Sequence, residues 1–241
     1  MRYSLAHPEW VPHDFDFARR SAGGRNPFAR ERVILSPVHP QTILILVRHG
    51  ETTANTDGVW HGSTDTPLNA RGEEQASRVA QHIRASFPDA AAVYTSDLQR
   101  ARRTAEAIGA ALGLTRRLED GLREYHLGSW EGKTYSELYH EHKLWHHIRK
   151  DPDFAPHGGE SPRQAAERLT AALRQIAAGH PGERVVVVTH GGALSMAMGA
   201  ILDGSYTQWR SVMDNCALSE LIFEPEPELL SFNVTDHLAD L

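Results

Sequence analysis

Two histidines stand directly after two apolar runs of similar length. The run ILILV (residues 43–47) is followed by Arg48 and His49, and the run VVVVT (residues 185–189) is followed by His190. Each run is long enough for a strand buried on both faces and too short for a typical helix. Because open α/β sheets hold their ligand sites at the carboxyl ends of parallel strands, we expect the two imidazoles to share one site.

The same edge is predicted to collect further polar groups. Ser96 and Gln99 have the spacing of a capping box, so a helix should begin there with Arg100 in its first turn. A helix start offers free backbone N–H groups, to which an arginine adds a forked donor. Such a set favours a pocket for a dianion with tetrahedral oxygens, and phosphate is the obvious candidate. The groups expected at this edge are Arg48, His49, Asn55, Arg100, Glu124 and His190.

These residue types suit phosphoryl transfer without a metal. A neutral imidazole is nucleophilic at physiological pH, and its second nitrogen can donate to the backbone and fix the reactive tautomer. Charge in the transition state spreads over the equatorial oxygens, so each fixed donor can contribute on the order of 3 kcal/mol. One carboxyl group can protonate the leaving oxygen and then accept a proton from water. Glu124 fits that role, and Glu131 is the second choice.

The elements that must position these groups alternate between strands and helices. We therefore predict an α/β fold, a three-layer α/β/α sandwich with a largely parallel central sheet. Strands are predicted at 43–47, 91–95, 185–189, 215–223 and 230–234, the last two as antiparallel edges; loops at 53–67 and 121–132; and helices capped by Asn69, Ser96, Thr134 and Ser161, ending near 86, 112, 149 and 178, with a shorter one at 193–202.

Residues 1–40 read differently from the rest of the chain. They mix prolines and arginines and have no sustained period of 3.6 or 2, so we interpret them as an N-terminal extension to a domain at 41–241. A loosely attached arm and a strap or lid anchored by Trp10, Phe15 and Phe17 both stay open.

Composition limits the partners. The chain has 241 residues, 40% hydrophobic and 23% charged, with a formal net charge of −6, so we expect one core and no basic field for nucleic acid or membranes. Cys216 is the single cysteine, which excludes an intramolecular disulfide and a cysteine metal cluster. No apolar stretch reaches the about 18 residues of a membrane span, and residues 1–12 lack a signal-peptide core. The prediction is a soluble cytoplasmic protein.

A group of histidines at 140–147 raises the question of a metal site. His142 and His146 are four residues apart and would share a face of one helix. No acidic residue completes a known zinc-helix pattern, and solvated histidines on helices are commoner. We therefore predict no metal and no cofactor.

Six stretches, in order, resemble the motifs of the histidine phosphatase superfamily, also called phosphoglycerate mutase-like. The similarity spans roughly residues 43–237 and includes VRHGET, GSTDTPLNARGEEQA, YTSDLQRARRTA, LREYHLGSWEG, HGGES and VVVVTHGG. The resemblance implies that His49 is the nucleophile, that Arg48, Arg100 and His190 hold the phosphoryl oxygens, and that Glu124 is the general acid. It also implies a substrate-binding set of Thr52, Asn55, His61, Gly62, Glu160 and the Gly191 backbone. His61 stands where the mutases usually have threonine, which leaves that part of substrate recognition open.

Three functions are compatible with this resemblance: a phosphomonoesterase, a mutase that returns the phosphoryl group to its substrate, and a module that binds phosphoryl groups without turnover. The third would normally lack a catalytic residue, and none is missing. Mutases of this kind carry a longer insertion over the pocket, whereas residues 124–159 should cross with one helix. We therefore favour a phosphatase acting on a small phosphorylated metabolite of the sugar or glycerate phosphate type. A homodimer is left open.

Overall fold

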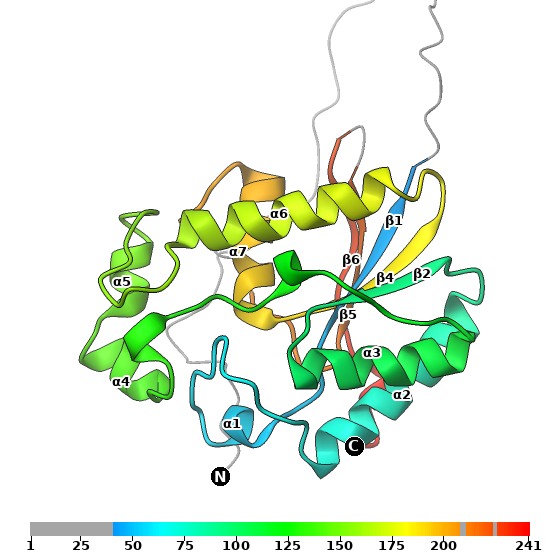
Figure 1. The fold of residues 1–241 in the computed structure, drawn as a ribbon, viewed down its shortest axis with the longest axis horizontal. Helices are drawn as coiled ribbons and strands as arrows, with labels where there is room; N and C mark the ends of the chain where they lie inside the picture. Colours follow the sequence, from blue (N-terminus) through cyan, green and yellow to red (C-terminus); the bar gives the residue numbers. More distant parts are fainter. Residues whose placement is uncertain (1–40, 208–210, 224–225) are drawn as a thin grey trace, which may run out of the picture. The chain divides into compact units, whose positions relative to one another are not determined.

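The core of the molecule is a mixed six-stranded sheet with the order β3-β2-β4-β1-β5-β6 (Figure 1). The computed structural model describes residues 41–207, 211–223 and 226–241. β1 pairs in parallel with β4 on one side and antiparallel with β5 on the other. Arg48 is aligned with Thr189, so His49 and His190 leave the sheet side by side. The strands are β1 (Ile43–Arg48), β2 (Ala92–Thr95), β3 (Arg117–Leu118), β4 (Arg184–Thr189), β5 (Leu218–Ile222) and β6 (Glu228–Val234).

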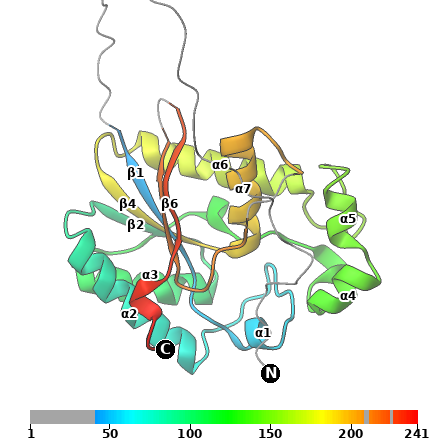
Figure 2. The same cartoon turned by 180° about the vertical axis from the view of Figure 1, so that it is seen from behind.

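Two pairs of helices cover the two faces of this sheet (Figure 2). α2 (Ala70–Ser86) and α3 (Gln99–Leu112) pack on one face, and α6 (Pro162–Ala178) and α7 (Gly191–Asp203) pack on the other. The period of two in β1 divides its apolar run between the layers: Leu44 and Leu46 join the α6–α7 core, whereas Ile45 and Val47 join the α2–α3 core. The predicted three-layer α/β/α architecture is confirmed.

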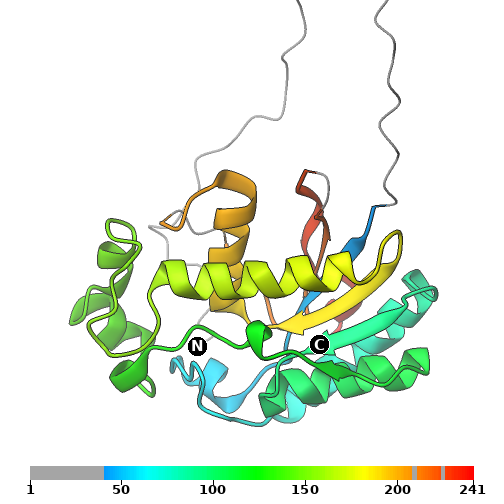
Figure 3. The ribbon, with the colours of Figure 1, turned by 45° about the horizontal axis from the view of Figure 1, so that its top comes forward.

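A third apolar cluster lies at one end of α6, where the short helices α4 (Tyr135–His140) and α5 (Leu144–Ile148) pack (Figure 3). Trp60 and Tyr125 join this cluster from two loops, and Met196 joins it from α7. The cluster therefore ties the segment that carries Glu124 to the helices of the sandwich. Among the described residues, no helix is both long and apolar enough to cross a membrane.

Local capping signals gave several helix boundaries correctly. α2 begins after Asn69, whose side chain accepts from the Gly72 N–H, and α6 begins after a capping box of Ser161 and Gln164. α4 likewise begins with the predicted box of Thr134 and Glu137. These signals depend on neighbouring residues alone, so the helix starts that they predict are found in the structure.

The predicted capping box at Ser96 is wrong. α3 begins at Gln99, and its N-cap is Leu98, whose side chain makes no capping hydrogen bond. The carboxylate of Asp65 accepts from the Gln99 N–H at 2.7 Å instead, and Ser96 bonds to His190. A contact distant in sequence has thus replaced the local cap.

The single helix predicted after Thr134 is also wrong, because Lys143, with φ of 47°, separates α4 from α5. In one continuous helix Leu138 and Leu144 would lie about 120° apart around the axis. The break allows both side chains to be fully buried. It also means that His142 and His146 do not share one helix face as predicted.

Smaller differences lie in the loops and at the sheet edge. The predicted loop at 53–67 contains the one-turn helix α1 (Thr53–Thr56). The predicted loop at 121–132 contains the end of the 3-10 turn η1 (Asp120–Leu122) and the whole of the 3-10 turn η2 (Gly128–Trp130). β5 lies inside the sheet rather than at its edge, and β3 and the last turn, η3 (Asp236–Leu238), had no sequence signal. The prediction for residues 1–40 falls outside the described residues.

Candidate active site

His49 follows β1 and is 1% exposed. Its Nδ1 lies 2.7 Å from the carbonyl oxygen of Gly50. A carbonyl can only accept a hydrogen bond, so Nδ1 carries the proton and Nε2 keeps a lone pair. Burial lowers the pKa of His49 well below 6.5, and the charges of Arg100 and Arg48 lower it further. The ring is therefore held neutral and in one tautomer.

His190 follows β4 and precedes α7, with its ring centroid 5.1 Å from that of His49. Its Nε2 lies 2.7 Å from the hydroxyl oxygen of Ser96, while its buried Nδ1 has no hydrogen-bond partner. Burial, followed by the charge of Arg100, lowers the pKa of His190 well below 6.5. The two predicted histidines are thus together, but they have different partners.

Arg100 is fully buried and is fixed by two backbone carbonyls. Its Nη1 donates to Thr64 at 2.9 Å and its Nη2 to Gly62 at 2.6 Å. Burial lowers the pKa of Arg100 to about 10, so the group remains a cation at neutral pH. Arg48, 5% exposed, donates from Nη1 to the Met213 carbonyl at 2.6 Å. Both guanidinium groups are therefore rigid.

Among the described residues, three buried nitrogens of the predicted site have no hydrogen-bond partner: Arg48 Nε, Arg100 Nε and His190 Nδ1. An unsatisfied buried polar group costs about 1–3 kcal/mol, so each one requires an explanation, and a ligand site is one such explanation. The nitrogens belong to two cations and an imidazole, which are groups that can donate to phosphoryl oxygens. This part of the site is suited to an anion.

Glu124 approaches the same region from the loop after η1 and is 8% exposed. One carboxylate oxygen accepts from the N–H groups of Tyr125 at 2.7 Å and Ala193 at 2.6 Å, and the other accepts from Gly192 at 3.0 Å. The carboxylate thus lies at the N-terminus of α7, where the helix dipole favours an anion. Its charge also acts on Arg100. A carboxyl group and the two histidines therefore meet at the start of α7.

Thr52 and Asn55 form a unit at α1. Thr52 is fully buried and caps this helix, and its hydroxyl and backbone N–H both donate to the Asn55 amide oxygen at 3.1 Å. Asn215 donates to the same oxygen at 3.3 Å and to the His49 carbonyl at 2.9 Å. With its oxygen occupied, Asn55 has its NH2 group left as a donor for a ligand. The contacts of Thr52 are those of a residue that orients Asn55.

His61 lies beside His49, and Gly62 follows it in the same loop. The His61 ring centroid is 5.9 Å from that of His49, and its Nδ1 is 2.7 Å from the Thr66 hydroxyl. Burial, with the charges of Arg100 and Arg48, lowers the pKa of His61 to about 3. A neutral imidazole therefore faces the anion site, and the Gly62 carbonyl fixes Arg100.

Gly191 and Glu160 have contrasting surroundings. Gly191 is the first residue of α7, and a Cβ there would lie 3.1 Å from Arg48 Nε, so glycine allows the guanidinium to pack against the helix start. Glu160 is paired with Arg168 at 2.6 Å and also accepts from the His126 N–H at 3.1 Å. Its observed contacts are thus with α6 and with the loop that carries Glu124. Glu131, the second candidate acid, accepts from Ser63 and Thr64 and holds their loop.

Sequence reasoning missed three residues of this site. Ser96 bonds to His190, but its spacing to Gln99 indicated a helix cap. Arg168 resembles any arginine on an amphipathic helix, and no sequence signal could have assigned it. Tyr135, at the start of α4, has its pKa raised by burial, and the charges of Arg48 and Glu124 also act on it. Its ring packs against Trp60 at a centroid distance of 5.9 Å, so Tyr135 borders the site from α4.

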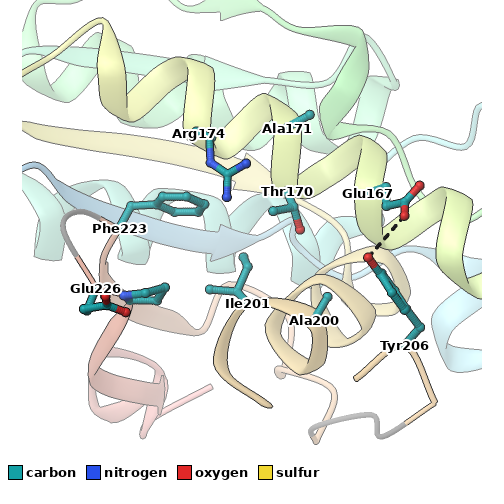
Figure 4. Close-up of a pocket in the computed structure, with 10 residues that line it drawn as sticks. Glu167, Thr170, Ala171, Arg174, Ala200, Ile201, Tyr206, Phe223 and Glu226 are labelled. Carbon is teal, nitrogen blue, oxygen red and sulfur yellow. Dashed lines mark hydrogen bonds between the residues drawn. The ribbon is translucent and has the colours of Figure 1, made fainter. Parts of the chain in front are cut away.

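A hollow in the described structure lies elsewhere (Figure 4). It has a volume of about 590 Å³ and is lined by α6, the end of α7 and the β5–β6 connection, including Arg174, Tyr206 and Phe223. The start of α7, where His190 and Gly191 lie, is roughly 15 Å away along the helix. None of the predicted site residues lines this hollow.

Among the described residues, no group of three or more His, Cys, Asp or Glu side chains is arranged to hold a metal ion. The histidines at 140–147 make ring contacts instead: His142 lies 4.3 Å from Trp130, and His147 stacks on Phe154 at 4.6 Å.

The chain is similar to a known protein family and to several known sequences. A model of the histidine phosphatase superfamily (branch 1) matches residues 44–235. A probable phosphoglycerate mutase of Cronobacter sakazakii is 35% identical over 199 residues, which cover 81% of this chain and 92% of the relative. The phosphoglycerate mutase-like protein 4 of Arabidopsis thaliana is 42% identical over 156 residues, which cover 63% and 67%.

Solved structures with similar folds include two named phosphatases. A mycobacterial glucosyl-3-phosphoglycerate phosphatase, in complex with VO3, is 30% identical, with a TM-score of 0.71 over 80% of this chain and 99% of that chain. A phosphoserine phosphatase of Entamoeba histolytica, in complex with 3-phosphoglyceric acid, is 31% identical, with a TM-score of 0.73 over 82% and 99%.

Proposed function

Because the chain belongs to the histidine phosphatase superfamily, we propose that it hydrolyses phosphomonoesters of small metabolites through a phosphohistidine on His49, without a metal ion. The observation that carries this proposal is the neutral His49, fixed in one tautomer, with three unpartnered buried nitrogens around it. Each of those nitrogens can donate to a phosphoryl oxygen, and together they would replace the charge that a metal supplies elsewhere.

In the first step, the His49 Nε2 lone pair attacks phosphorus, an N–P bond forms and the ester P–O bond breaks. The leaving alkoxide takes a proton from the Glu124 carboxyl group. In the unliganded protein three backbone N–H groups hold the Glu124 carboxyl group at the start of α7.

In the second step, a water molecule attacks the phosphohistidine. The water gives its proton to the Glu124 carboxylate, an O–P bond forms, and the N–P bond breaks to return neutral His49. Arg48, Arg100, His190 and the Asn55 amide would hold the phosphoryl oxygens in both steps. Protons and charges then balance over one turnover, and no cofactor is consumed.

A phosphoglycerate mutase is the second candidate, and the names of the curated relatives favour it. A mutase must hold its bisphosphate between two transfers and keep water out. Residues 124–159 form only the short helices α4 and α5, the 3-10 turn η2 and the loops that connect them, which favours the phosphatase. The solved phosphatase structures, which this chain covers almost completely, point the same way.

The experiment is a panel of sugar phosphates, phosphoglycerates and phosphoserine, assayed on the full chain for both free phosphate and positional isomers. The proposal expects phosphate release to exceed isomerisation for every substrate. Isomerisation of phosphoglycerate that outpaces phosphate release would establish the mutase instead. Excess chelator should leave the rate unchanged, whereas loss of activity that a divalent ion restores would contradict the metal-free mechanism.

A further inference from the structure

The backbone of the loop that carries Glu124 is held by hydrogen bonds, in addition to the contacts that its side chains make. The carbonyls of four consecutive residues, 121–124, each accept a hydrogen bond from a side chain elsewhere in the fold. Thr189, next to His190, donates to Leu122 at 2.8 Å. Arg168 on α6 donates to the other three, Gly121 at 3.0 Å, Arg123 at 2.9 Å and Glu124 at 3.3 Å.

Arg168 uses its whole guanidinium group in this position. Its Nη1 contacts two of the carbonyls, its Nη2 contacts the third and one oxygen of Glu160 at 2.7 Å, and its Nε contacts the other oxygen of Glu160 at 2.6 Å. A guanidinium has five N–H donors, and all five are thus engaged. Lysine could not reproduce this planar set of contacts.

Glu160 extends the hold to the far side of Glu124. Its carboxylate accepts from the His126 N–H at 3.1 Å, and its own N–H donates to the His126 carbonyl at 2.8 Å. Its side chain is 22% exposed and that of Arg168 is 25% exposed, so the pair is partly shielded from water. The backbone on both sides of Glu124 is therefore fixed by one ion pair.

We propose that the Glu160–Arg168 pair is a positioning device for the Glu124 carboxyl group. This inference rests on the proposed role of Glu124 as proton donor, and it assigns to Glu160 a role other than the substrate contact that the motif implies. The carboxyl group must reach the leaving oxygen within hydrogen-bond distance, and a displacement of about 1 Å can cost about a hundredfold in rate. Neither member of the pair touches the reacting atoms.

The test uses leaving groups that differ in their need for a proton. A glycerol phosphate leaves as an alkoxide and needs protonation, whereas p-nitrophenyl phosphate leaves without it. kcat/KM reports the steps up to transfer to His49, so it is independent of the later water attack. Arg168→Met should lower kcat/KM for glycerol phosphate by about a hundredfold and for p-nitrophenyl phosphate by less than about fivefold.

Four further variants complete the series: Glu124→Gln, Arg168→Lys, Glu160→Gln and Arg163→Met. Glu124→Gln must show the same leaving-group dependence, and Arg168→Lys and Glu160→Gln should show it more weakly; these two also serve if Arg168→Met does not fold. Arg163 lies on the same helix and is paired with Asp153 at the surface, so Arg163→Met is the matched control and should leave kcat/KM unchanged for both substrates.

Equal losses for both substrates in the Arg168 and Glu160 variants, with Glu124→Gln still selective, would overturn the positioning role and leave the proposed function standing. If Glu124→Gln itself affected both substrates equally, the assigned proton donor would be wrong and the positioning role would fall with it.

Discussion

The carboxyl ends of β1 and β4 present two buried histidines in matched settings, yet the two ends differ in one contact. At β1 the second nitrogen of His49 is bonded to a carbonyl, which can only accept. At β4 the second nitrogen of His190 is bonded to a hydroxyl, which can donate or accept. The first contact fixes a tautomer with a free lone pair, and the second allows the ring to donate to a bound oxygen. The difference teaches that the hydrogen-bond partner, rather than burial, separates the two histidines, and it supports the proposal that His49 is the nucleophile and His190 a ligand of the phosphoryl group.

The largest effect should come from replacing the histidine that follows β1. His49→Ala removes the attacking nitrogen, so kcat/KM should fall by about 10⁴-fold or more. His190→Ala removes one donor to the phosphoryl group and should cost about 10²- to 10³-fold. The measurement is phosphate release from p-nitrophenyl phosphate, with circular dichroism as the control for folding. Equal losses in both variants would remove the distinction between the two ends.

A smaller effect should appear in stability, through the third imidazole of the site. Burial and two arginines lower the pKa of His61 to about 3, whereas it titrates near 6.5 in the unfolded chain. Between these values the unfolded state binds one more proton, so the free energy of unfolding falls by about 1.4 kcal/mol for each pH unit as pH decreases below the unfolded value. His61→Asn should reduce that slope by about this amount.

Urea denaturation from about pH 7 to about pH 5 measures the slope. His140→Asn, at an exposed position on α4, is the matched control variant. An unchanged slope in His61→Asn would mean that the pKa of His61 is not lowered in the folded protein.

The smallest effect should come from the hydroxyl at the β4 end. Ser96→Ala removes one hydrogen bond to His190, worth about 1 kcal/mol, so kcat/KM should fall about fivefold. Ser77→Ala, at an exposed position on α2, serves as control. A loss as large as that of His190→Ala would show that the hydroxyl acts on the substrate directly.

The sequence predicted what local chemistry decides. The apolar runs gave β1 and β4 and therefore placed His49 beside His190, and the capping boxes gave the starts of α4 and α6. Contacts between distant residues could not be read in this way. The spacing of Ser96 to Gln99 fits a helix cap, which conceals its contact with His190. Arg168 looks like any other arginine on α6, and only its contacts with the 121–124 loop distinguish it.

The break between α4 and α5 was hidden for a related reason. Lys143 adopts a positive φ without the glycine or proline that would announce a turn. The break is required by burial of Leu138 and Leu144, and that need exists only once the cluster around Trp60 and Met196 has formed.

The most direct measurement of the central claim is the position of the phosphoryl group during turnover. The full chain is mixed briefly with a labelled phosphomonoester, quenched at alkaline pH, where phosphohistidine survives, and digested for peptide mapping. We predict the label on Nε2 of His49, with none in His49→Ala and a reduced amount on the same residue in His190→Ala. Label on His190, or full turnover with no labelled histidine at all, would contradict the account.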